Sequence, residues 1–157
     1  ATPAEGTCGR FLEKDKKSFG EIPGVTDKAY YTNSYHIPVN YKISIFEKIE
    51  KEAPFHRLCN AGHISYVELP SSPENNIIAF EKILKHMKDN DMGYAGLNFP
   101  IDECKECGFS GIIDDNCPGC GSHDIRRIRR ITGYLSTIDR FNDAKQAELF
   151  DRKIHDM

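Results

Sequence analysis

The sequence lacks any run of apolar residues long enough to cross a bilayer, and it lacks a large excess of charge of either sign. Its 157 residues carry 21 lysines and arginines against 24 aspartates and glutamates, so the formal net charge is −3. These absences argue against a membrane span and against a wide basic face for nucleic acid. Because 39% of the residues are apolar, the chain can form a packed core, and we expect a soluble folded protein.

Targeting signals, repeats and flexible linkers are also missing. Residues 1–5 have neither the basic region nor the apolar segment of a signal peptide, and the first residue is Ala1, which indicates a processed form or a piece of a longer protein. Four of the six cysteines form two C-x-x-C pairs, whereas Cys8 and Cys59 stand alone. This usage favours metal ligation in a reducing compartment over a disulfide framework, so we expect a cytoplasmic location.

Apolar periodicity and capping signals predict three helices alternating with three strands before residue 100. The predicted helices cover residues 3–18, 44 to Pro54, and 72 to about 90. The predicted strands cover residues 30–38, 63–69 and 92–99. This order is typical of an α/β layer with parallel strands. A parallel sheet needs both faces covered, and three strands are few, so we expect part of a larger sheet or barrel.

The beginning of the first predicted helix has the chemistry of a phosphate site. Thr2 can cap the helix, Pro3 suits its first position, and Glu5 follows three residues after the cap. Free backbone N–H groups and the positive end of the helix dipole attract phosphate there. Gly6 would allow close approach and Thr7 offers a hydroxyl. A plain capping box that binds nothing is the alternative interpretation.

A cluster of four cysteines follows the change in composition at Pro100. Its two C-x-x-C pairs are separated by nine residues and comprise Cys104, Cys107, Cys117 and Cys120. Four thiolates at tetrahedral corners suit Zn²⁺ with no open coordination position, and iron is the main competitor for the same ligands. Such a closed site is structural, because its binding energy becomes folding energy. We assign no reactivity to Cys8 or Cys59.

Arginines follow the second cysteine pair directly, at positions 126, 127, 129 and 130. A zinc ribbon followed by basic residues is typical of nucleic-acid-binding modules, which gives an alternative function for this region. The net charge of −3 and the absence of an accompanying row of aromatic residues argue against it. Gly133, just beyond the arginines, would by itself be interpreted as a turn glycine.

The same stretch carries a family resemblance. The segment Arg129-Arg130-Ile131-Thr132-Gly133-Tyr134-Leu135, followed by Asp139-Arg140-Phe141-Asn142 and Lys145-x-x-Glu148, resembles the glycyl-radical segment near the C-terminus of anaerobic (class III) ribonucleoside-triphosphate reductases. The four cysteines match that family's zinc site, and residues 22–27, 31–36 and 61–68 resemble further family segments in the same order. The resemblance extends over essentially the whole chain.

The resemblance implies a fold and three functional parts. The family fold is a ten-stranded α/β barrel with a central finger loop, of which this chain would supply the C-terminal portion. Residues 1–99 would be the last strands and helices of the barrel, residues 100–125 the zinc module, and residues 126–157 the glycyl-radical loop and a C-terminal helix. This division explains the shortage of strands.

The resemblance also implies a reaction. Gly133 would store a radical after a partner activase, an iron–sulfur enzyme that uses S-adenosylmethionine, removes a Cα hydrogen. The radical would generate a thiyl radical on a finger-loop cysteine, and a ribonucleoside triphosphate would be reduced to its 2′-deoxy form by formate or a thiol protein. That cysteine and the regulatory nucleotide region have no counterpart here. We therefore expect this piece alone to be inactive and the full-length protein to be a homodimer.

Glycine is required for such a radical because the Cα centre must become planar, and a side chain would crowd that geometry. Burial is expected to protect the radical, since oxygen adds to it and cuts the chain.

The resemblance further implies that Ala4, Glu5, Gly6 and Thr7 lie near the substrate phosphates, and that the arginines fix the loop or contact the activase. A related glycyl-radical enzyme with a different substrate is a third hypothesis, which the zinc cluster disfavours. Asn33, His36 and His63 receive no role.

Overall fold

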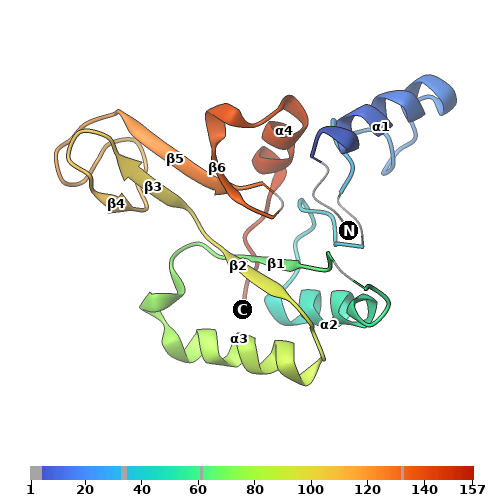
Figure 1. The fold of residues 1–157 in the computed structure, drawn as a ribbon, viewed down its shortest axis with the longest axis horizontal. Coiled ribbons are helices and arrows are strands. Elements are labelled where there is room, and N and C mark those ends of the chain that lie inside the picture. Colours follow the sequence, from blue (N-terminus) through green and yellow to red (C-terminus); the bar gives the residue numbers. More distant parts are fainter. Residues whose placement is uncertain (1–4, 33–34, 61, 132) are drawn as a thin grey trace.

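The structure, a computed structural model, describes residues 5–32, 35–60, 62–131 and 133–157. Figure 1 shows a parallel pair of strands with two helices on one side, and a separate antiparallel sheet above them. Helices near the two ends of the chain lie together on the opposite side of the molecule from the cysteine loops. No helix in the described part of the chain is long and apolar enough to cross a membrane.

The first layer is built on strands β1 (Ser65–Glu68) and β2 (Ala95–Asn98), which pair in parallel. Helices α2 (Ile45–His56) and α3 (Ile77–Asp89) cover one face of this pair (Figure 1). The core between helices and strands is apolar and comprises Ile45, Ile49, Val67, Ile83 and Met87. Because strand side chains alternate, Ser65 and Val67 are buried toward the helices, whereas Tyr66 and Glu68 point to the other face.

The predicted alternation of helices and strands is largely confirmed, with corrections at two helix ends. Helix α1 (Glu5–Phe19) and strands β1 and β2 lie where the sequence places them. Ser72 caps only a short 3-10 turn, η1 (Pro73–Asn75), and α3 follows it with Asn76 as its cap. The predicted end of α2 at Pro54 is wrong, because the helix continues to His56. Buried His56 holds this last turn through its Nδ1, which accepts a hydrogen bond from the Gly93 N–H at 3.0 Å.

The predicted strand over residues 30–38 is also wrong, since the described residues of this range form no strand. Polar groups of the segment bond to side chains of distant elements. The Tyr30 hydroxyl donates to Asp151 Oδ2 at 2.7 Å, and the Ile37 N–H donates to Glu52 Oε1 at 2.9 Å. Aromatic and β-branched residues favour any half-buried extended surface, so this composition does not by itself specify a paired strand.

The second sheet is antiparallel, with strand order β4-β3-β5-β6. Its strands are β3 (Ile101–Cys104), β4 (Ser110–Gly111), β5 (Ile125–Arg130) and β6 (Leu135–Thr137). The 3-10 turn η2 (Ile138–Arg140) leads into helix α4 (Asp143–Asp151). Strand β5 therefore connects the cysteine loops directly to the hairpin that contains Gly133.

Contacts of the C-terminal segment tie the layers together. The His155 N–H donates to the Glu68 carbonyl at 3.0 Å, and the Ile45 N–H donates to the Asp156 carbonyl at 2.8 Å. Helix α1 packs closely on α4, because a methyl group built on Gly9 would lie 3.2 Å from Ala144 Cβ. The residues that follow α4 thus return to the first layer beside β1.

We predict that Ile83→Ala destabilises this chain by about 2–5 kcal/mol, because Ile83 is 3% exposed in the core and its truncation leaves a cavity. Ile78 lies on the same helix and is 69% exposed, so Ile78→Ala should change the free energy of unfolding by less than about 0.5 kcal/mol. Urea unfolding of the 157-residue chain measures both. Equal effects of the two substitutions would contradict the core described above.

Candidate metal centre and glycine hairpin

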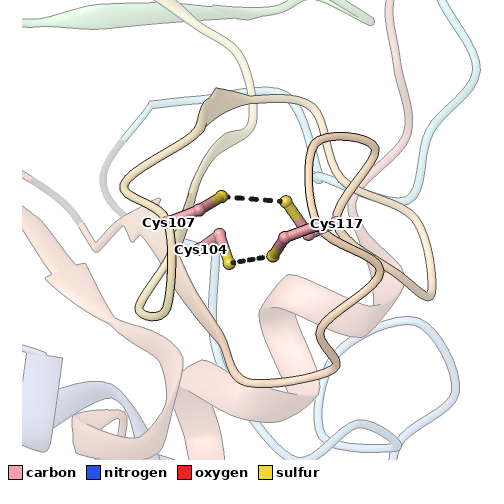
Figure 2. A group of neighbouring side chains, drawn as sticks. Cys104, Cys107 and Cys117 are labelled. Atoms are coloured by element: carbon pink, nitrogen blue, oxygen red, sulfur yellow. Dashed lines mark hydrogen bonds between the residues drawn. The ribbon is translucent and has the colours of Figure 1, made fainter.

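The four cysteines predicted to bind metal converge in space. The sulfur atoms of Cys104, Cys107, Cys117 and Cys120 all lie within 4.8 Å of one another. Figure 2 shows the side chains of Cys104, Cys107 and Cys117 turned toward a common centre. The sulfur atoms of Cys107 and Cys117 are 3.5 Å apart, and those of Cys104 and Cys120 are 3.6 Å apart. Tetrahedral zinc–thiolate coordination requires sulfurs about 3.8 Å apart. The donor set and its spacing fit a four-coordinate metal ion.

Each cysteine pair sits in a tight turn that ends at a glycine. The Gly108 N–H donates to the Cys104 carbonyl at 3.0 Å, and the Gly121 N–H donates to the Cys117 carbonyl at 2.8 Å. Both glycines have positive φ angles, 74° and 76°, which residues with a side chain rarely adopt. The two turns are therefore equivalent in construction and bring their sulfurs together from opposite sides.

The backbone around the second pair favours a thiolate. The Gly119 N–H donates to Cys117 Sγ at 3.4 Å. Burial opposes ionisation of Cys117, but N–H groups of Cys120 and Gly119 and the neighbouring thiols lower the pKa of Cys117 to about 7. A metal ion binds cysteine as thiolate, so this environment suits ligation.

Gly133 lies at the tip of the hairpin between β5 and β6. The Ile131 N–H donates to the Tyr134 carbonyl at 2.9 Å and closes the turn. A Cβ built on Gly133 would meet no described atom within 4 Å, and the residue is exposed. The expected burial of Gly133 is therefore not provided by the described residues of this chain. Thr132 lies outside the described residues.

The arginines that precede the hairpin all have carboxylate partners. Side chains along strand β5 point alternately to the two faces of the sheet. Arg127 and Arg129 therefore lie on the same face as buried Asp102 of β3. Arg129 donates to Asp102 at 2.6 Å, and Arg127 contacts the same carboxylate at 3.4 Å. On the other face, Arg126 pairs with Glu103 at 2.7 Å.

Arg130, the last residue of β5, crosses to the first layer. Its Nη2 donates to Glu68 Oε1 at 2.7 Å, and its guanidinium carbon lies 3.7 Å from the centre of the Tyr66 ring. The Asn98 amide also donates to Glu68. Burial alone would raise the pKa of Glu68, but the charges of Arg130 and Arg152 hold it below its usual range. The Glu68 carboxyl group is therefore ionised at neutral pH.

A second arginine holds the backbone of the hairpin. Arg152 follows α4, and its guanidinium donates to the carbonyls of Arg130 at 2.8 Å and Ile131 at 3.1 Å. The same group donates to Glu148 Oε1 at 2.8 Å, and buried Lys145 donates to the other oxygen of that carboxylate. Burial would raise the pKa of Glu148, but the two cations lower it.

A cavity of about 50 Å³ lies beside this network, between β1, α2, α4 and the segment of residues 36–39. Its polar lining includes Lys48, Glu68, Arg130 and His155. Lys48 pairs with Glu52, so the cations that line the cavity are largely neutralised by carboxylates. The His155 Nδ1 accepts a hydrogen bond from the Glu68 N–H at 2.9 Å.

The predicted phosphate segment lies at the start of α1. Ala4 is outside the described residues, and Glu5 and Gly6 begin the helix. The half-buried Thr7 accepts a hydrogen bond from Arg10 at 3.4 Å. Asn33, like Ala4, lies outside the described residues.

The histidines left without a role have structural partners. The His36 Nε2 lies 2.6 Å from the Ile64 carbonyl, and the His63 ring packs edge-on against His56. Sequence reasoning missed Asp102, Glu68 and Arg152 as partners of the arginine-rich strand and its hairpin. Alternation along 65–68 indicates that Tyr66 and Glu68 share a face, but it does not indicate what they contact.

Comparison with known proteins connects this site to a family. The family model described as anaerobic ribonucleoside-triphosphate reductase matches residues 1–155. The chain belongs to this family. The anaerobic ribonucleoside-triphosphate reductases of Escherichia coli strain K12 and Enterobacteria phage T4 are 43% and 39% identical to it over 165 aligned positions. These alignments cover 99% of this chain but 23% and 27% of the relatives, so the chain spans about a quarter of their length.

Solved structures of anaerobic ribonucleotide reductases share the fold. One matches 99% of this chain and 24% of its own length, with a TM-score of 0.81 and 24% identity. A second, from Thermotoga maritima in complex with dATP and CTP, matches 94% of this chain and 23% of its own length, with a TM-score of 0.71 and 23% identity. The family and fold inferred from the glycine stretch and the cysteines are confirmed. The nucleic-acid-binding alternative is not favoured, because the four arginines are paired within the protein.

We predict that Cys117→Ser lowers the metal content from one ion per chain by at least about tenfold, because three thiolates and a hydroxyl no longer form the closed site. Cys59→Ser should leave the content unchanged, since Cys59 is not part of the cluster. Elemental analysis after anaerobic purification measures both variants. A Cys117→Ser protein with full metal content would contradict the assignment of this ligand.

We predict that the free energy of unfolding depends on pH through His155. Burial and the charge of Lys48 lower the pKa of His155 to about 4, below the value near 6.5 of the unfolded chain. The unfolded state therefore binds the proton first, and stability present above pH 6.5 is lost as pH falls toward 4. By pH 5 the loss from this residue is about 2 kcal/mol.

The matched test replaces His155 with a neutral acceptor. His155→Asn should reduce the change in unfolding free energy between pH 7.5 and 5, measured by urea unfolding of this chain. His123 is exposed, so His123→Asn should leave that change as in the parent protein. An unaltered pH dependence in His155→Asn would show that His155 does not titrate as described.

Proposed function

We propose that this chain is the C-terminal part of an oxygen-sensitive glycyl-radical enzyme that reduces ribonucleoside triphosphates to 2′-deoxyribonucleoside triphosphates for DNA synthesis. In this proposal Gly133 stores the radical. One observation carries it: in a chain of this family, Gly133 occupies the tip of a hairpin whose stem is tied to both layers of the fold. The radical would be passed to a cysteine that is outside this chain.

The surroundings of Gly133 support a chemical reason for the glycine. A methyl group would fit there without a clash, so packing does not require glycine at this position. A Cα radical does require it, because conjugation with both flanking amides needs a planar centre. Gly133 is exposed here, and we propose that protein outside these residues covers it in the full-length enzyme, whose relatives are about four times longer.

Zinc is our proposal for the metal held by the four cysteines. When bound to four thiolates it supplies no catalysis, because no coordination position is open to water or substrate. It would lock the two cysteine turns together at the end of β3 and ahead of β5. The register of β5, and with it the position of the hairpin, would then depend on an ordered metal module.

The remaining partners follow from the proposed reaction. Ala4, Glu5, Gly6 and Thr7 would lie near the substrate phosphates, where N–H groups at the start of α1 favour an anion. An activase using S-adenosylmethionine and an iron–sulfur cluster would install the radical, and formate or a thiol protein would supply electrons. We further propose that the full-length enzyme is a cytoplasmic homodimer, consistent with six cysteines that form no disulfide among the described residues.

The decisive prediction concerns air exposure. We expect the full-length protein, activated anaerobically and then exposed to oxygen, to be cut at Gly133, because oxygen adds to a backbone Cα radical. Intact mass measured before and after exposure detects the cut. An uncut chain that had carried a normal radical signal would contradict the assignment to Gly133.

Gly133→Ala provides the matched control. The open space around Gly133 should allow the variant to fold and retain its metal, while the radical signal and the oxygen-dependent cut disappear. Electron paramagnetic resonance and elemental analysis of the same sample test the two properties together. A normal glycyl-radical signal in Gly133→Ala would place the radical elsewhere.

A further inference from the structure

We propose that the buried ion pair between Arg130 and Glu68 is a positioning device, which fixes the hairpin against β1 and so sets how efficiently a radical at Gly133 is used. This inference rests on the proposed function of Gly133. Neither side chain carries the radical, and both act through the backbone that they hold.

Arg130 is restrained on three sides of its planar guanidinium group. One edge binds Glu68 at 2.7 Å, and Nη1 donates to the Ile131 carbonyl at 2.8 Å. The Tyr66 ring lies against the guanidinium group, 3.7 Å from its carbon to the ring centre. The planar guanidinium group is held by an ion pair, a carbonyl and an aromatic ring, so it has a single orientation. The flexible ammonium group of a lysine would not be fixed in this way. Arg130 lies only three residues before Gly133.

Arg152 restrains the same backbone through different contacts. It donates to the carbonyls of Arg130 and Ile131, at 2.8 and 3.1 Å, and Glu148 fixes its guanidinium group. The stem of the hairpin is therefore held from β1 and from the end of α4, while Gly133 at the tip has no described atom around its Cβ position. A fixed stem with an open tip suits a backbone atom that must meet a reacting group in another part of the enzyme.

The neighbouring pair of Arg126 and Glu103 provides an internal comparison. It joins the same strand, β5, to a carboxylate at the same 2.7 Å distance. Its side chains are 48% and 40% exposed, whereas those of Arg130 and Glu68 are 11% and 14% exposed. Exposed ion pairs contribute little to structure, so Glu103→Gln removes an equivalent charge without releasing the hairpin.

The test uses the full-length enzyme with its metal in place, activated anaerobically. Spin counting by electron paramagnetic resonance gives the radical per protein, and deoxynucleotide formation gives the turnover per radical. We expect Glu68→Gln to lower turnover per radical at least about tenfold, since displacement of a reacting group by about 1 Å costs on the order of a hundredfold. Glu103→Gln should match the parent enzyme. A role confined to folding would change radical yield and metal content but not turnover per radical.

A second variant covers the case in which Glu68→Gln fails to fold because Arg130 is left buried without a counter-charge. In the double variant Glu68→Gln with Arg130→Gln, neither residue of the pair carries a charge, and two neutral amide side chains face each other at the contact. It should show the same loss of turnover per radical, and Arg130→Lys should be intermediate because it keeps the charge but not the planar fork.

The outcomes separate the two proposals. Turnover per radical equal to the parent in both Glu68→Gln and the double variant would overturn the positioning role and leave the function of Gly133 intact. A parent enzyme that shows neither a radical signal nor oxygen-dependent cleavage would overturn the proposed function, and this inference with it.

Discussion

The ion pair between Arg130 and Glu68 joins the two layers of this protein, and its burial constrains everything around it. A charge removed from water is tolerated only when hydrogen bonds and an opposite charge replace the lost hydration. Glu68 receives these from Arg130 and from the Asn98 amide, which the parallel pairing of β1 and β2 places beside it. The end of β5 must therefore contact the end of β1. This contact fixes the position of the hairpin that follows β5.

The same alternation of side chains gives the arginine-rich strand its internal character. Arg127 and Arg129 share the face of Asp102, while Arg126 and Arg130 lie on the other face and find Glu103 and Glu68. A basic run in the sequence thus becomes a set of structural ion pairs. This is why the pattern of a nucleic-acid-binding ribbon does not produce a basic surface here.

Features of the fold could be predicted from the sequence where the interacting residues are close together along the chain, and could not where they are far apart. The cysteine turns and strands β1 and β2 were predictable because local spacing and composition specify them. The strand expected over residues 30–38 does not form among the described residues, because Tyr30 and Ile37 bond to Asp151 and Glu52, which are remote in sequence. No local pattern reports such partners. The continuation of α2 beyond Pro54 has the same origin, since His56 is held by Gly93.

The sequence by itself determined the family, and it predicted the metal ligands and the glycine proposed to store the radical, because each depends on residue type at fixed spacing. Only the tertiary structure decided which carboxylates neutralise the arginines and how Arg152 reaches the backbone of Arg130 and Ile131. These contacts join residues from separate elements, and burial selects among candidate partners that look equivalent along the chain. The tertiary structure also decided that the stem of the hairpin, rather than Gly133 at its tip, is the part that this chain holds in place.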